Sequence, residues 1–225
     1  MARKNLLFLL LAPILLLLTA TPGLSDPGGL ALGLKAGTLG GGLEGTAGLL
    51  PRINLRAGAN TFRFNFDTSS RDNEYRMKTR LLSFPIVLDW HPFKTSAFRV
   101  SSGMLLNYNE ADARGTTQDS ITIGSTTYTA DQVGKLTGKV DFNKIAPYAG
   151  IGWGNALGKT GRWSLSCDIG VVFQGKARVD MFASGPIASD PNFQADLERE
   201  KRDLKERLDD YKYYPVIALG INYRF

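Results

Sequence analysis

The sequence predicts an all-β protein: an eight-stranded, up-and-down antiparallel β-barrel that crosses a membrane, with one short helix in its last long loop. Three observations predict this fold. Segment after segment alternates apolar and polar residues, so each strand would present one apolar face. The connections between these segments alternate between short and long. After residue 25 no apolar run is long enough for a transmembrane helix, whereas a closed barrel crosses lipid with all its backbone groups paired.

Residues 1–25 have the pattern of a secretory signal peptide. Arg3 and Lys4 precede an apolar run at 6–18, and small residues lead to a cleavage point after Ser25. The apolar run is too short to anchor the chain in a bilayer. The rest of the chain, 26–225, fits one barrel domain. Its only cysteine is Cys167, so we expect an exported domain without an internal disulfide.

Charge and composition argue against a nucleic-acid partner. The formal net charge is +6, from 27 Lys and Arg against 21 Asp and Glu, and the basic residues are scattered among acidic ones. Mean hydropathy is −0.12, a value typical of soluble proteins. Because only alternate residues of a barrel strand face lipid, this value does not exclude a membrane barrel.

The glycine-rich segment at 27–50 is open to two interpretations. It forms either two short strands, about 28–38 and 41–50, or one long strand. Two strands make the total even, so that both ends of the chain lie on the same side of the membrane. We therefore expect eight strands and not seven.

The third strand carries an irregularity. Its apolar residues alternate from Ile53 to Ala59, and then Phe62, Phe64 and Phe66 take the opposite parity. A phase change inside one run predicts a β-bulge near Asn60.

Four further strands are predicted over about 75–90, 98–108, 138–153 and 163–173. In the last of these the phase continues to Met181, which would turn Lys176, Arg178 and Asp180 inward.

Two long polar segments interrupt the alternation. Residues 111–137 are polar, with a small hairpin predicted over 121–128. Residues 190–210 change to a helical period, with Ser189 or Asp190 as a cap, Pro191 in the first turn and a thin apolar stripe. We expect a solvated loop helix resting on the barrel rim; the alternative is a partner-binding helix.

The chain ends on a closing strand, 213–225, whose Tyr223 and Phe225 share the apolar face. An aromatic carboxy terminus resembles the assembly signal of Gram-negative outer-membrane barrels. The unequal connections then give direction, since such barrels have short periplasmic turns and long external loops. The long loops, expected outside, are 67–74, 111–137 and 183–210. Both termini would be periplasmic, and all three tryptophans would lie at periplasmic strand ends.

Three motif blocks carry a wider resemblance: Trp90-His91-Pro92-Phe93, residues 146–155, and residues 214–225. With them the chain resembles the small outer-membrane barrels of the OmpA/OmpW-like group, within a largely uncharacterised family. The resemblance implies an outer-membrane location. It also implies contact with outer-membrane lipid, and with the barrel-assembly machinery and periplasmic chaperones during biogenesis. It brings no catalytic residue and no cofactor.

The candidate site is a charged cluster on the inward parity near the periplasmic half. Charges buried away from water should pair. We interpret the cluster as a plug of ion pairs, or alternatively as a gated polar path; its members are Arg56, Asp89, Arg99, Asp168 and Arg224.

We expect neither enzyme activity nor a metal site. His91 is the only histidine and falls in a periplasmic turn, whereas barrel enzymes generally need their histidine on the outer side. The expected function is a non-catalytic barrel with a side-chain-filled lumen, serving envelope structure or binding an unknown surface ligand through its long loops. The alternative is a narrow channel for small hydrophobic molecules, favoured by prolines inside strands at 85, 147 and 215.

Overall fold

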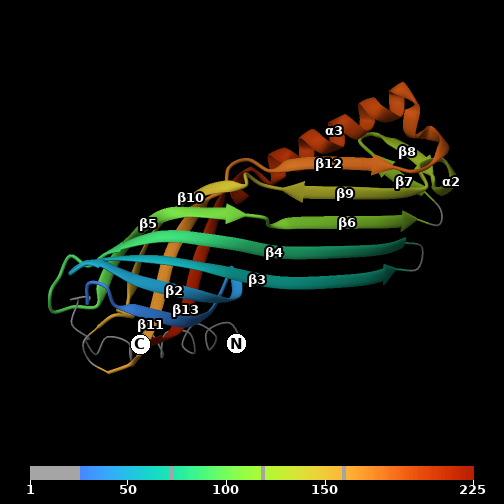
Figure 1. Cartoon of the computed structure of the whole chain (residues 1–225). Helices are drawn as coiled ribbons and strands as arrows, with labels where there is room; N and C mark the ends of the chain where they lie inside the picture. Colours follow the sequence, from blue (N-terminus) through green and yellow to red (C-terminus); the bar gives the residue numbers. More distant parts are fainter. Residues whose placement is uncertain (1–25, 71–72, 118–119, 159–160) are drawn as a thin grey trace, which may run out of the picture.

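A computed structural model describes residues 26–70, 73–117, 120–158 and 161–225. The predicted signal peptide, 1–25, lies outside the described residues. Eight antiparallel strands close into a barrel, because each pairs with the next and the last pairs with the first (Figure 1). In order around the barrel these are β1 (Leu30–Gly37), β2 (Gly40–Leu50), β3 (Ile53–Ser70), β4 (Asn73–Trp90), β5 (Phe98–Asn107), β10 (Ile145–Trp153), β11 (Trp163–Phe173) and β13 (Tyr213–Arg224).

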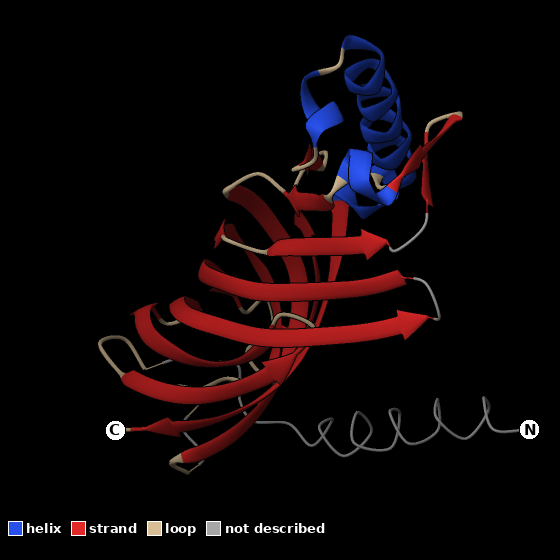
Figure 2. Ribbon diagram, turned by 90° about the vertical axis from the view of Figure 1, so that its right-hand side faces the viewer, coloured by secondary structure: helices blue, strands red, loops and turns tan. Residues whose placement is uncertain are grey.

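One side of the barrel wall continues far beyond the rim. Strands β3 and β4 extend beyond the barrel. Three more strands pair beside this part of them, in the order β3–β4–β6–β9–β12. We call this region the extension. Its other elements are β6 (Glu110–Thr117), β7 (Ser120–Ile123), β8 (Thr126–Thr129), α2 (Ala130–Val133), β9 (Lys135–Asp141), β12 (Arg178–Ala183), the 3₁₀ turns η1 (Pro186–Ser189) and η2 (Asp209–Lys212), and α3 (Pro191–Arg207). Figure 1 shows α3 running alongside the edge strand β12, with the β7–β8 hairpin at the far end of this sheet, and Figure 2 shows the helix above the sheet edge.

Several sequence-based expectations are confirmed. The glycine-rich start forms two strands, β1 and β2, and the hairpin pairs Ile121 with Tyr128. Helix α3 begins after Asp190, whose carboxylate accepts hydrogen bonds from the backbone N–H groups of Asn192 and Phe193. The segments at 67–74 and 111–137 differ from the expectation, because they consist mostly of extension strands and not of polar loops.

The barrel is apolar outside and polar inside. On β4 the side chains of Phe84, Ile86 and Leu88 are exposed, while Val87 and Asp89, which alternate with them, are buried. The same alternation runs around the barrel; exposed apolar residues of other strands include Leu30, Leu32, Leu34, Val100, Met104, Ile145, Ile151, Leu165, Ile169, Ile217 and Ile221. A closed sheet with an apolar outer face can lie in lipid without an unpaired edge.

The predicted bulge near Asn60 was wrong. Strand β3 pairs with β4 in one unbroken register from Ile53–Trp90 to Ser70–Asn73. The register shift lies instead in β2, between Gly48 and Leu50. Phe62 and Phe64 therefore lie on the lumen side of the sheet. The apolar parity changes because the outer side of β3 passes from lipid to water, and not because the backbone slips.

The predicted inward position of Lys176, Arg178 and Asp180 was also wrong. All three are exposed, and Val179 between them is 3% exposed. The chain breaks the strand between Phe173 and Arg178, which shifts the inward parity by one residue. Beyond this break the polar residues face out, as in β3.

An apolar core covers the β12 side of the inner face of the extension. Phe193 of α3 is 0% exposed and meets Tyr128 of the hairpin edge-on, with ring centroids 5.0 Å apart. The remaining buried members of this core are Ile123, Val133, Ala177, Val179, Met181 and Leu197. Helix α3 therefore packs on the extension sheet, and no described helix is long and apolar enough to cross a membrane.

Candidate functional site: an ionic network across the barrel lumen

Six strands each send one charged side chain into the lumen. They are Lys35 from β1, Glu44 from β2, Arg56 from β3, Asp89 from β4, Arg99 from β5 and Asp168 from β11. Each residue has the inward parity of its strand, so the alternation that gives the barrel its apolar outside also brings these charges together. We call these six residues the ionic network.

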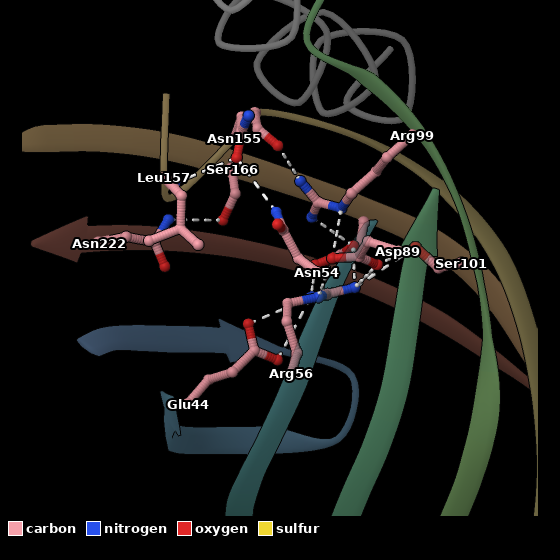
Figure 3. A network of polar contacts seen from close by, with 12 residues as sticks. Glu44, Asn54, Arg56, Asp89, Arg99, Ser101, Asn155, Leu157, Ser166 and Asn222 are labelled. Carbon is pink, nitrogen blue, oxygen red and sulfur yellow. Dashed lines mark hydrogen bonds and ion pairs between the residues drawn. The ribbon is translucent and has the colours of Figure 1, made fainter. Parts of the chain in front are cut away.

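Arg56 lies at the centre of the network. Its guanidinium reaches Asp89 at 2.5 Å, Glu44 at 3.1 Å and Asp168 at 3.2 Å. Figure 3 shows its side chain between Glu44 on one side and Asp89 on the other. The side chain of Arg56 is only 6% exposed, so these contacts replace most of its hydration.

Two further cations complete the pairing. Arg99 contacts Asp168 at 2.6 Å and Asp89 at 3.6 Å, and Lys35 contacts Asp168 at 2.7 Å and Glu44 at 2.9 Å. Every carboxylate therefore faces at least two cations. Three cations balance three carboxylates, so the network as a whole is neutral. Such an arrangement limits the cost of placing charge in a low-dielectric interior.

Glycine and serine support the network locally. A Cβ added to Gly152 would lie 2.9 Å from both the Arg99 Nε and an Asp168 carboxylate oxygen, so glycine leaves the space that this pair occupies. The Ser101 hydroxyl donates to Asp89 at 2.6 Å. These contacts fix the side chains in one arrangement.

The network divides the lumen into two cavities. The cavity on the side of the extension, which we call the upper cavity, has a volume of about 40 Å³. It is mostly apolar and is lined by residues such as Leu39, Pro85, Val87, Leu105 and Val216. The lower one, about 10 Å³, is polar and is lined by residues such as Thr46, Asn54, His91, Ser166 and Asn222. Glu44 and Arg56 line both cavities, so their ion pair lies between them.

The structure brings together four of the five residues predicted for this cluster. The exception is Arg224, which is half-buried and makes no side-chain ion pair with the rest of the described chain. Sequence reasoning missed Lys35 and Glu44. A signal was present, because these are the only charged residues of the glycine-rich segment 27–50.

His91 follows β4 and is 0% exposed at the lower cavity. Neither of its ring nitrogens has a hydrogen-bond partner among the described residues. The carboxylate nearest in sequence, Asp89, is bound by Arg56 and Arg99. Within the described ranges, no group of three or more His, Cys, Asp or Glu residues is placed to hold a metal ion.

The two residues predicted as an assembly signal lie on the outer face at the lower rim. The rings of Tyr223 and Phe225 are 5.5 Å apart, and Trp163 meets Tyr223 at 5.0 Å. Phe225 is 77% exposed, and its backbone N–H donates to Leu30 across the closing seam. An aromatic cluster at a strand end is typical of a membrane interface; its role in assembly stays a prediction.

Comparison with known proteins identifies a shared fold. No family model matches the chain, and no curated protein matches it by sequence. Among solved structures, Acinetobacter baumannii CarO2 aligns with 19% identity over 88% of this chain and 98% of its own, with a TM-score of 0.58. CarO from the same organism aligns with 21% identity over 89% and 98%, with a TM-score of 0.56.

A major outer membrane protein of Thermus thermophilus also aligns, with 14% identity over 87% of this chain and 99% of its own, at a TM-score of 0.35. At such low identities the comparisons describe the fold alone, and the CarO alignments cover nearly all of it. The chain has the closed, eight-stranded fold of a small outer-membrane β-barrel, as the CarO proteins do.

Proposed function

We propose that this protein is a non-catalytic integral outer-membrane barrel with a closed lumen, which acts in envelope structure or surface binding through its extension. The observation that carries the proposal is the ionic network, which draws one charge from each of six strands across the lumen. Opening a path would separate these charges. Unpairing one buried partner costs about 3–5 kcal/mol, so the closed state dominates.

We further propose that the extension lies outside the cell and both termini in the periplasm, after removal of a signal peptide at 1–25. The charged outer face and helix α3 of the extension are suited to water. The long connections between barrel strands, from β5 to β10 and from β11 to β13, also lie on this side. An epitope tag inserted at the Gly124–Ser125 turn should be accessible to antibody on intact cells. Labelling only after the outer membrane is broken would contradict this orientation.

Insertion through the barrel-assembly machinery is the third part of the proposal, with Tyr223 and Phe225 as its signal. Deleting Phe225 should abolish heat-modifiable migration of the expressed protein on gels, whereas Tyr108→Ala at the opposite end should preserve it. A Phe225 deletion that folds like the parent would contradict the signal.

Conductance tests the closed lumen directly. Wild-type protein in a planar bilayer should give no steady single-channel openings, because Arg56 and Glu44 separate the two cavities. Glu44→Ala and Arg56→Ala should each join the cavities and produce openings, and Lys78→Ala, on the outer face, should not. Steady openings of the wild type would contradict the proposal.

A narrow path for small hydrophobic molecules is the second candidate, and the apolar upper cavity favours it. This cavity lies beneath the β1–β2 turn, where Leu39 packs against the lumen's apolar cluster. The wall is low here, because β3 and β13 both continue past the turn. Vesicle uptake of a small fluorescent apolar compound, blocked by Leu39→Trp, would support this candidate; equal uptake by protein-free vesicles would contradict it.

A further inference from the structure

The outer face of the extension carries charged side chains in aligned rows. Arg80 of β4 is opposite Glu110 of β6, Glu110 is opposite Asp141 of β9, and Asp141 is opposite Arg178 of β12. Arg178 contacts Asp141 at 2.6 Å, and Arg80 contacts Glu110 at 3.7 Å. This row is the first one above the lipid-facing surface of β4, since the next outward residues on that strand are Leu82 and Phe84.

A second row lies one step further out, where Lys139 is opposite both Asp112 and Asp180. The ammonium of Lys139 reaches back to Glu110 at 3.4 Å and so connects the two rows. The carboxylates therefore hold three cations side by side across four strands.

A hollow lies against these rows, where the strands break between barrel and extension. Its volume is about 270 Å³, compared with about 40 Å³ for the upper lumen cavity. Four cations and two carboxylates line it, a net charge of +2: Arg80, Lys139, Lys144, Arg178, Glu110 and Asp141. Lys144 is exposed and makes no ion pair within the described chain.

The lower edge of the hollow carries two large apolar side chains beside Asn107 and Asn109. Leu82 and Tyr108 line it, and Tyr108 meets the lipid-facing Phe84 edge-on with ring centroids 6.2 Å apart. A ligand that fits both parts must carry an anionic head above and hydrocarbon below. Guanidinium and ammonium groups bind phosphate oxygens through charge-assisted hydrogen bonds.

We propose that this hollow binds the phosphorylated headgroup of an outer-leaflet glycolipid, whose acyl chains lie along Leu82, Phe84 and Tyr108. Lys139 and Lys144 contact the phosphate, and Glu110 and Asp141 position Arg80 and Arg178 beside it. The inference rests on the proposed orientation of the barrel, because only there does the hollow lie at the external membrane surface. It adds a specific lipid site to a barrel whose outer surface is otherwise mostly apolar.

The test measures which lipid stays bound to the purified full-length barrel after transfer from vesicles of neutral phospholipid. Native mass spectrometry would compare a bisphosphorylated, acylated glycolipid with its enzymatically dephosphorylated form. Wild-type protein should retain the phosphorylated form at least about tenfold better, as expected for two or more charge-assisted contacts. Inorganic phosphate at equal concentration should not displace it, because it lacks the acyl chains.

The matched variants remove two charges each. Lys139→Gln with Lys144→Gln should lose the preference, whereas Lys94→Gln with Lys205→Gln, away from the hollow, should keep it. Equal retention of the two lipids by wild type, an equal loss in both double variants, or displacement by inorganic phosphate would each overturn the inference.

Heat-modifiable migration identifies variants that have folded. Wild-type protein that shows no preference for the phosphorylated lipid, yet remains closed and non-conducting, sinks only this inference. A tag at Gly124 that is reached only from the periplasm sinks the proposed orientation instead.

Discussion

The barrel and the extension belong to one continuous sheet, yet their two faces are reversed. Along the outward side of β4, Leu88 and Ile86 face lipid, while Arg80 and Lys78 further along the same strand face water. Inside, the barrel buries charge such as Asp89, and the extension buries Phe193. Along β3 and β4 the backbone continues from one region into the other in a single register. The medium outside the sheet changes from lipid to water. Apolar side chains therefore face outward in the barrel and inward in the extension.

The two interiors are also held together differently. The barrel lumen is organised by the ionic network, in which each charge depends on partners from other strands. The extension is organised by apolar contacts between α3, the hairpin and β12. Removing one member of the network leaves unpaired charges, whereas removing one apolar side chain leaves a cavity. Loss of a network charge should therefore destabilise the whole barrel, whereas loss of a core side chain of the extension should destabilise the extension alone.

The largest effect is expected for Arg56→Met. This change removes one cation from each of Glu44, Asp89 and Asp168. The free energy of unfolding should therefore decrease by an amount near the upper end of the range of about 3–5 kcal/mol. Denaturant unfolding of the protein in vesicles would measure it. Arg224→Met is the matched control, since Arg224 lies outside the network, and it should cost less than about 1 kcal/mol. Equal losses would show that the network does not stabilise the barrel.

Phe193→Ala should have an effect of similar size that stays within the extension. Phe193 is fully buried, and such truncations cost about 3–5 kcal/mol. Limited proteolysis should therefore cut the extension, while heat-modifiable migration should show an intact barrel. Loss of both together would mean that the two regions fold as one unit.

A single strand allows the reversal to be tested by charge placement. Ile86→Arg puts a charge on the lipid face of β4 and should lower stability by about 2–4 kcal/mol. Lys78→Leu, on the same face but in the extension, should change stability by less than about 0.5 kcal/mol. If Ile86→Arg were as mild as Lys78→Leu, residue 86 would not face lipid.

The smallest effect is expected from pH. The Thr126 and Tyr128 hydroxyls, which hydrogen-bond to Asp196, hold the pKa of that carboxyl below its ordinary value of 3.8. The folded extension thus favours the charged form, so this stabilisation is complete above pH 3.8 and is lost as pH falls through the lowered pKa. Proteolysis of the extension should accelerate on acidification, and less so in Asp196→Asn. An identical acid response in the variant would exclude Asp196 as the cause.

Much of the fold could be predicted from the sequence, because alternation reports directly which face of a strand meets lipid. The reversal of the two faces could not be predicted. If lipid surrounds the whole of the third strand, the apolar parity of Phe62 and Phe64 requires a bulge, and the sequence does not show where lipid gives way to water. Helix α3 was predicted from its cap and period, but its binding surface was not. That surface combines Tyr128 and Met181, which are far apart in the sequence.

The candidate site was only partly predictable, for a related reason. Parity identified the inward charges of β3, β4, β5 and β11. Lys35 and Glu44 lie in a segment whose division into strands was uncertain, so their parity could not be assigned. Arg224 was included on parity alone. How far along the barrel axis a side chain lies depends on the strand registers, which the sequence does not specify.

Spin-label accessibility along β4 tests the reversal most directly. Single cysteines at the outward positions 78–90 of a Cys167→Ser background would carry a nitroxide in vesicles. Collision rates with oxygen, which partitions into lipid, and with a water-soluble nickel chelate would then be compared. Labels at Phe84, Ile86 and Leu88 should respond mainly to oxygen, and labels at Lys78 and Arg80 mainly to the chelate. A uniform response along the strand, or chelate access at Ile86, would contradict a change of solvent between barrel and extension.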